Sequence, residues 1–160
     1  MKIMVCGSIG FGGIEDIRLI QQLLIDNGYD VVDQISKEEM DYSYIDDFRD
    51  KKELAEEIIN HDLKYIGQCD IIVVVLNRPS MGTAIEMLYA KKYSKTIILL
   101  AKDKVPTPWP IFFSDYIVKS KNELLHLLHN YNKSVITRIS TESNNTKEIK
   151  ITNKGLRMKR

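Results

Sequence analysis

The chain has few of the residues on which small secreted or metal-binding proteins depend. Its 160 residues include only two cysteines, Cys6 and Cys69, each close to an expected strand. Two are too few for a disulfide framework or a cysteine-based metal cluster. No apolar run is long enough to cross a bilayer, and the first residues lead into an expected strand without the features of a signal peptide. We therefore expect a cytoplasmic protein without a membrane partner.

The sequence also lacks a strong charge of either sign. A net charge of +1 and an apolar content of 44% are typical of a globular chain, and its length suits one domain with a sizeable core. The chain is acidic on balance up to residue 132 and clearly basic from residue 133 onward. We predict one domain at residues 1–132 and a mobile, polar, basic tail at residues 133–160. Such a tail either touches an acidic partner or is a solvated end; we favour the solvated end and expect no nucleic-acid partner.

Segments typical of strands alternate with segments typical of helices. Three prolines, at positions 106, 108 and 110, predict a rigid, non-helical connection before the last strand. We expect Asp50 and Ser120 to cap two of the helices, and Ser36 to begin a short helical turn with Glu39. The expected strands are residues 2–6, 29–33, 71–76, 95–100 and 116–118, and the expected helices are residues 14–27, 51–68, one from about 83, and one from 120 to 131.

This alternation predicts an α/β fold with a parallel sheet. We expect a flavodoxin-like (Rossmann-type), doubly wound, five-stranded parallel sheet flanked by helices, with strand order 2-1-3-4-5. In that order the first and third strands border the crevice where such sheets bind ligands. The loop that begins at Gly7 should therefore face the helix start around Ser80 and Gly82.

A glycine-rich turn follows the first strand, with the sequence Gly-Ser-Ile-Gly-Phe-Gly-Gly at residues 7–13. Glycines allow backbone N–H groups to approach a ligand closely, and the following helix start favours an anion. The spacing is not that of the dinucleotide fingerprint, and the Gly-Lys-Ser/Thr of a Walker motif is missing. Because many α/β proteins use such a turn only for tight packing, both interpretations remain open.

Glu86 is a lone carboxylate in an otherwise apolar helix start, just after the third expected strand. A poorly solvated acid is costly unless it has a partner or a task, although Glu86 could instead lie on the exposed stripe of its helix. Ser80 and Thr83 either bind a phosphate or sugar hydroxyl or cap this helix. Asp62 lies late in the preceding helix, where it points toward the sheet edge or is a surface acid. We interpret His61 as a surface or core histidine.

Three segments together resemble the nucleoside 2-deoxyribosyltransferase superfamily: strand-Gly-Ser-Ile, then His-Asp-Leu at residues 61–63, then the run at residues 79–90. The resemblance covers roughly residues 1–129 and is closest to the 2′-deoxynucleoside 5′-monophosphate N-hydrolases. It implies hydrolysis of the N-glycosidic bond of these nucleotides to free base and 2-deoxyribose 5-phosphate. In this pattern Glu86 is the nucleophile and Asp62 assists. A deoxyribosyltransferase that exchanges bases, or a non-catalytic nucleotide-binding module on the same fold, are the alternatives.

The resemblance also implies how the substrate is held. The partner is a small-molecule nucleotide, the protein is a homodimer with shared active sites, and no metal or cofactor takes part. A serine of the neighbouring subunit reaches the phosphate in this pattern, and Ser114 is the best match. Two positions depart from it, since Gly10 stands where the hydrolases have an arginine and Met4 where they have a tyrosine. The residues implied in substrate binding are Cys6, Gly7, Ser8, Ile9, Gly10, Phe11, Gly12, Ser80, Gly82 and Ser114.

Overall fold

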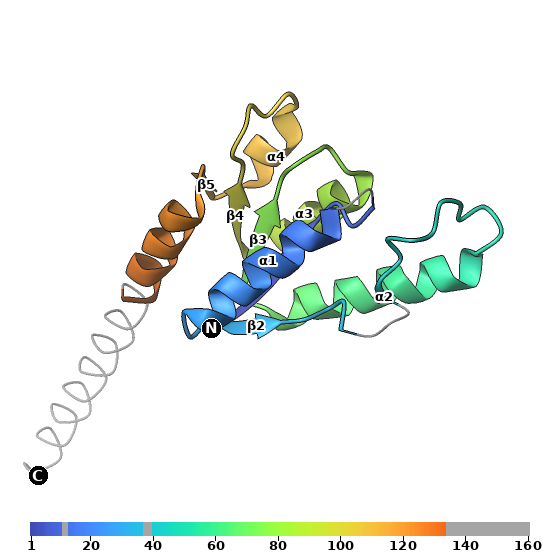
Figure 1. Ribbon diagram of the computed structural model, residues 1–160, viewed down its shortest axis with the longest axis horizontal. Helices are drawn as coiled ribbons and strands as arrows, with labels where there is room; N and C mark the ends of the chain where they lie inside the picture. The colour runs from blue at the N-terminus through green and yellow to red at the C-terminus, as the bar shows by residue number, and fades with distance from the viewer. Residues whose placement is uncertain (11–12, 37–39, 134–160) are drawn as a thin grey trace, which may run out of the picture. The chain divides into compact units, whose positions relative to one another are not determined.

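A five-stranded parallel sheet forms the centre of the protein. The computed structural model describes residues 1–10, 13–36 and 40–133. The strands are β1 (Lys2–Gly7), β2 (Asp30–Val32), β3 (Ile71–Val75), β4 (Thr96–Leu100) and β5 (Tyr116–Val118). Their order is β2-β1-β3-β4-β5, and every neighbouring pair is parallel. The predicted order is confirmed, and the carboxyl ends of β1 and β3 lie side by side. Figure 1 shows β3 beside β4.

Helices cover both faces of this sheet. The helices between strands are α1 (Gly13–Asp26), α2 (Lys52–Gln68), α3 (Met81–Lys92) and α4 (Pro108–Phe113). Helix α1 packs on β1 and β2, whereas α3 packs on β1, β3 and β4 and contacts α2 on one side and α4 on the other. Right-handed crossovers require this arrangement, because the chain leaves β1 toward one sheet edge and leaves β3 toward the other.

The chain divides into two compact units, residues 1–124 and residues 125–160. The sheet and α1–α4 belong to the first unit. A helix covers residues 121–133, and Ser120 caps it as predicted, since its hydroxyl accepts a hydrogen bond from the Glu123 N–H at 3.2 Å. The predicted tail lies outside the described residues except for Lys133. No helix in the described ranges is long and apolar enough to span a bilayer.

The central strands are buried because helices cover both faces of the sheet. All five residues of β3 are buried, which explains the continuous β-branched run in the sequence. On the face covered by α2 and α3, the largest side chains of the core include Met4, Ile66, Ile72 and Met87, each at most 1% exposed. Burying a side chain of this size stabilises the fold by roughly 1.5–3 kcal/mol. Helix α3 is therefore held firmly against the sheet at the point where its first turn begins.

Two local predictions were wrong. The proline-rich connection is helical at Pro108–Phe113, because prolines in the first turn of a helix lack only N–H groups that would have no partner there. Asp50 does not cap α2: its carboxylate accepts from the Lys51 ammonium at 3.1 Å, and α2 begins without a side-chain cap. Gly28, just after α1, has φ +80, a left-handed conformation that favours glycine. The turn predicted from Ser36 to Glu39 extends beyond the described residues.

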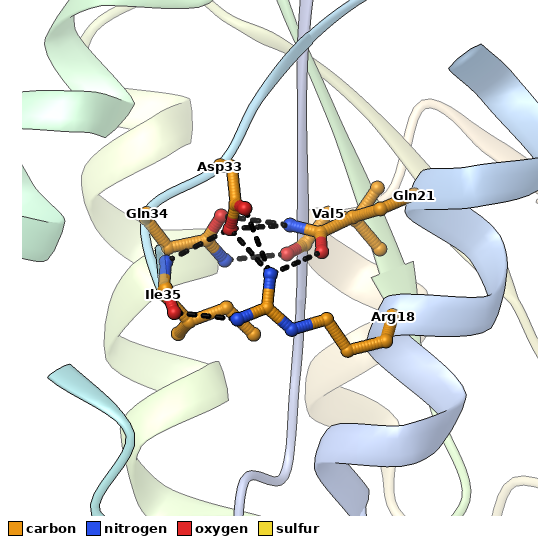
Figure 2. A network of polar contacts seen from close by, with 6 residues as sticks. All are labelled: Val5, Arg18, Gln21, Asp33, Gln34 and Ile35. Carbon is orange, nitrogen blue, oxygen red and sulfur yellow. Dashed lines mark hydrogen bonds and ion pairs between the residues drawn. The ribbon is translucent and has the colours of Figure 1, made fainter. Parts of the chain in front are cut away.

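A polar network fixes the chain where it leaves β2 (Figure 2). Arg18 of α1 donates to both carboxylate oxygens of Asp33 at 2.8 Å and to the carbonyl of Ile35 at 2.5 Å. The amide of Gln34 donates to the carbonyl of Val5 in β1 at 2.6 Å. Asp33 stands at the end of β2, where dinucleotide-binding proteins have the acid that holds a ribose. Because Arg18 occupies both of its oxygens, the arrangement argues against that mode of binding.

Candidate active site

A small cavity brings the two predicted catalytic carboxylates together. It has a volume of about 180 Å³, and it lies between α2 and α3 beside the end of β1. Asp62 of α2 and Glu86 of α3 line it, together with Gly7 at the end of β1. The other lining residues are Tyr42, Ile58, Ile59, Leu63, Ser80, Gly82, Thr83 and Ile85. The carboxylates therefore share a largely apolar enclosure at the crevice that the strand order predicts.

Helical spacing explains why both acids face this space. Asp62 follows the buried Ile58 by four residues, so the two side chains lie on the same face of α2. Glu86 follows the buried Thr83 by three residues and is itself only partly exposed. The exposed stripe of α3 is formed instead by Met81, Ile85 and Leu88. The alternative that Glu86 lies on the exposed stripe of its helix is therefore wrong.

The environment of Glu86 disfavours its charged form. Burial is the main cause, and the nearby Asp62 carboxylate adds to it, so that the pKa of Glu86 rises from 4.5 to about 8. The Cys6 thiol donates a hydrogen bond to the Glu86 carboxylate, which acts in the opposite direction. Burial, and then Glu86, raise the pKa of the Cys6 thiol well above its usual range, so the thiol keeps its proton. Cys6 is fully buried and does not line the cavity; it contacts the site through its hydrogen bond to Glu86.

Asp62 is also poorly solvated. Its side chain is 16% exposed, and burial raises its pKa from 3.8 to about 6. The Nδ1 atom of His61 lies 3.7 Å from its carboxylate, and the His61 ring packs on Tyr65 with ring centres 4.6 Å apart. His61 is thus a largely buried neighbour of Asp62, a relation that the sequence did not indicate because adjacent helical residues rarely share a face. Between about pH 6 and pH 8 the Asp62–Glu86 pair shares one proton.

The start of α3 supplies polar groups at the edge of the cavity. The Ser80 hydroxyl accepts a hydrogen bond from the Thr83 N–H at 3.4 Å and thus caps the helix while lining the cavity. A Cβ atom on Gly82 would meet only the Ser80 hydroxyl, at an ordinary 3.8 Å, so the missing side chain leaves room in the cavity itself. The buried hydroxyl of Thr83 has no hydrogen-bond partner among the described residues. An adjoining cavity of about 250 Å³ shares Ser80 and Thr83 but has no titratable side chain in its lining.

Two glycines of the glycine-rich turn are required by close packing. A Cβ atom on Gly7 would lie 2.8 Å from the Val75 carbonyl oxygen, and one on Gly13 would lie 1.7 Å from the Ser8 carbonyl oxygen. Only glycine therefore fits at these two positions. Gly7 lines the cavity, whereas Ser8, Ile9 and Gly10 do not, and Ile9 is buried. Phe11 and Gly12 lie outside the described residues.

Three further residues complete the account of the site. The Ser114 hydroxyl donates to the Pro110 carbonyl at 2.6 Å at the end of α4, and Ser114 does not line the cavity of its own chain. Met4, at a position where the hydrolases have a tyrosine, is fully buried in the core. Tyr42 lines the cavity from the loop between β2 and α2. No periodicity or motif distinguishes Tyr42 in the sequence.

Comparisons with known proteins agree with this fold. No curated protein sequence is significantly similar to the chain. A 2-deoxyribosyltransferase from Bacillus psychrosaccharolyticus has a similar structure, with a TM-score of 0.61 and 17% identity over 78% of this chain and 90% of that one. The CMP N-glycosidase BcmB of Clostridium botulinum is also similar, with a TM-score of 0.53 and 19% identity over 82% of this chain and 99% of that one. At these identities the likeness shows the fold.

The sequence itself matches a family model over nearly its whole length. The model describes nucleoside 2-deoxyribosyltransferases and matches residues 5–155. Its span includes the end of β1, Asp62, the start of α3 and Glu86, which all line or border the cavity. The chain therefore belongs to the nucleoside 2-deoxyribosyltransferase family, whose enzymes act on N-glycosidic bonds.

Proposed function

We propose that the protein hydrolyses the N-glycosidic bond of 2′-deoxynucleoside 5′-monophosphates. Glu86 acts as the nucleophile and Asp62 as the proton donor. The observation that carries the proposal is the placement of both carboxyl groups in one cavity of about 180 Å³, where burial raises both of their pKa values. Titratable pairs in such poorly solvated clefts are typical of acid–base and covalent catalysis.

Cleavage proceeds in two steps. The Glu86 carboxylate attacks C1′ as the bond to the base breaks, and the departing nitrogen takes the proton of Asp62. An ester between the sugar and Glu86 then holds the oxocarbenium-like carbon, which divides one difficult step into two easier ones. In the second step, Asp62 accepts a proton from a water molecule that attacks C1′. This attack releases 2-deoxyribose 5-phosphate and restores both carboxyl groups.

The proton shared by the pair determines which state reacts. In the ligand-free protein, burial disfavours the charged form of both groups, and more strongly that of Glu86. The reactive arrangement has the shared proton on Asp62 and the charge on Glu86, with the same total charge. The hydrogen bond from Cys6 favours this arrangement, because it stabilises the Glu86 carboxylate. Oxocarbenium character at C1′ stabilises the same carboxylate further during the reaction.

Preference for a phosphorylated substrate rests on the start of α3. The helix presents free N–H groups and the Ser80 hydroxyl beside the cavity, and Gly82 leaves these groups accessible. The N-terminus of a helix favours an anion through these donors and through the helix dipole. We therefore assign the 5′-phosphate to this end of the cavity.

Base exchange is the second candidate function. The family model is named for deoxyribosyltransferases, and the Bacillus enzyme of similar structure carries that name. The two activities share the glycosyl-enzyme ester and differ in the group that attacks it, water in one and a second base in the other. Incubation with a nucleoside and a different free base distinguishes them. New nucleoside without net release of sugar would identify a transferase.

We also propose that the protein assembles as a homodimer. The side chains of Met81, Ile85 and Leu88 form an exposed apolar stripe along α3, with Met81 82% exposed. This stripe runs beside the Glu86 cavity, of which Ile85 is part. Because Ser114 does not line that cavity in its own chain, its implied contact with phosphate requires a second copy. Light scattering of the wild type and of Leu88→Glu tests the assembly, and a wild-type monomer with full activity would exclude it.

The decisive experiment measures release of free base. The wild type is incubated with the four 2′-deoxynucleoside 5′-monophosphates and the four nucleosides, alongside Glu86→Gln. We expect release from at least one monophosphate by the wild type, and a loss of nearly all turnover in the variant. Intact-mass spectrometry during turnover should detect the sugar phosphate bound to the wild type and not to Glu86→Gln. Retention of more than a few per cent of the wild-type rate by the variant would exclude Glu86 as the nucleophile.

A further inference from the structure

Tyr42 is held at the cavity by contacts within its own loop. The neighbouring Met40 is buried, which anchors the chain just before the tyrosine. Asp41 accepts hydrogen bonds from the N–H and the hydroxyl of Ser43, at 3.1 and 2.6 Å, and so forms a tight turn around it. The Tyr42 ring meets Phe48 edge to face, with ring centres 5.7 Å apart and planes at 84°. These contacts fix both the backbone and the ring of Tyr42.

The chain that leads toward this loop is also anchored. The contacts of Arg18 with Asp33 and Ile35 hold the segment after β2 against α1, and Gln34 ties it to β1 (Figure 2). The network involves none of the cavity-lining residues. Its effect is to fix the point from which the chain departs for the loop that carries Tyr42.

The phenol of Tyr42 is an available hydrogen-bond donor. Within the described ranges no residue forms a hydrogen bond with its hydroxyl, although the residue lines the cavity. Burial, and then the charges of Glu86 and Asp62, raise the pKa of Tyr42 from 10.0 to about 12. The hydroxyl therefore keeps its proton wherever the enzyme works. Because a partly buried O–H group without an acceptor is unfavourable, a ligand at the cavity is well placed to supply the acceptor that the described residues do not.

The lining of the cavity indicates which part of the substrate meets this donor. Tyr42 lines the same cavity as Glu86 and Asp62. Since C1′ must face Glu86 for the ester to form, the pentose occupies the cavity that Tyr42 lines, while base and phosphate extend beyond it.

We propose that Tyr42 is a substrate-binding residue whose hydroxyl donates a hydrogen bond to a hydroxyl group of the pentose. This inference rests on the proposed function, because it places the sugar against Glu86. In a 2′-deoxynucleoside 5′-monophosphate the acceptor is the 3′-hydroxyl, the only free hydroxyl of the sugar. Tyr42 thereby orients the ring so that C1′ lies toward the nucleophile.

Removing each partner of this hydrogen bond in turn tests the proposal. kcat/KM is measured for the wild type and Tyr42→Phe with a 2′-deoxynucleoside 5′-monophosphate and with its 2′,3′-dideoxy analogue. We expect Tyr42→Phe to lose about threefold to tenfold on the deoxy substrate, the effect of one neutral hydrogen bond, and little on the dideoxy analogue. Tyr44→Phe is the matched control, because Tyr44 lies in the same loop but is 70% exposed. It should match the wild type on both substrates.

The outcomes separate this inference from the proposed function. Equal losses on the two substrates would mean that the phenol only supports the loop, and no loss on either would mean that it does not contact the sugar; both overturn the inference. If the wild type releases base normally while either result is found, the proposed function still stands. If the wild type releases no base from any monophosphate, the proposed function itself fails. The wild type gives an independent check, since loss of the 3′-hydroxyl should weaken its kcat/KM at least as much as Tyr42→Phe does.

Discussion

Replacement of Glu86 by glutamine should change how the stability of the ligand-free protein depends on pH. The pKa of Glu86 is about 8 in the folded state and 4.5 as the ordinary value. Between these values the folded protein keeps a proton that the unfolded chain loses, so the free energy of unfolding falls as pH rises from about 4.5 to 8. At about 1.4 kcal/mol per pH unit the full displacement corresponds to about 5 kcal/mol. Structural relaxation and water in the cavity reduce this value, so we expect the free energy of unfolding to fall by about 2–4 kcal/mol.

Glutamine has nearly the same shape as glutamate and stays neutral, so Glu86→Gln should lack this fall. Urea unfolding of the wild type and the variant at pH 5, 7 and 9 measures this fall. The free energy of unfolding of the variant, relative to that of the wild type, should increase from pH 5 to pH 7 and again to pH 9. A smaller fall between about pH 3.8 and 6 should remain, because the pKa of Asp62 is also raised. Glu57→Gln, on the exposed side of α2, is the matched control. A stability difference between Glu86→Gln and the wild type that is the same at pH 5 and pH 9 would refute the poorly solvated cavity.

Three further changes test the site. The profile of kcat/KM against pH should be bell-shaped, with limbs near pH 6 and pH 8 that both belong to the Asp62–Glu86 pair. Asp62→Asn should abolish the fall in kcat/KM at alkaline pH, because the variant has no proton donor that could be deprotonated there. Cys6→Ala should move the alkaline limb to higher pH, since it removes a hydrogen bond that lowers the pKa of Glu86; an unmoved limb would contradict that contact. Ser80→Ala should lower kcat/KM for a monophosphate by roughly tenfold or more while barely affecting the nucleoside, and equal losses on both would make Ser80 only a cap.

The fold was predictable because its signals are local and repeated. The β-branched run of β3 indicated burial on both faces, and alternating strands and helices led to a parallel sheet with the observed order. The two wrong predictions arose where the same local sequence feature is compatible with two different structures. Pro108 and Pro110 forbid the interior of a helix but suit its first turn. Asp50 has the right spacing for a cap, yet its carboxylate pairs with Lys51.

The sequence indicated the two carboxylates because each lies in a recognisable sequence pattern. It did not indicate which other residues of the site contact them. Glu86 is the lone acid of an apolar helix start, and Asp62 lies among apolar neighbours in the motif of the family. The thiol of Cys6 reaches Glu86 because α3 packs on β1 in the folded protein. The spacing of the two residues in the sequence does not indicate this contact. The buried position of His61 against Asp62 likewise depends on what α2 packs against.

Tyr42 illustrates most directly where local reasoning stops. A loop residue has no periodic partner, so its burial is decided by contacts far away in the sequence. Here the loop follows a segment that Arg18 of α1 fixes through Asp33, and the ring rests on Phe48. If this anchoring sets the position of the phenol, Arg18→Met should reproduce part of the Tyr42→Phe loss on the deoxy substrate, although neither Arg18 nor its hydrogen-bond partners line the cavity. An unchanged kcat/KM in a folded Arg18→Met protein would show that the loop alone determines where Tyr42 lies.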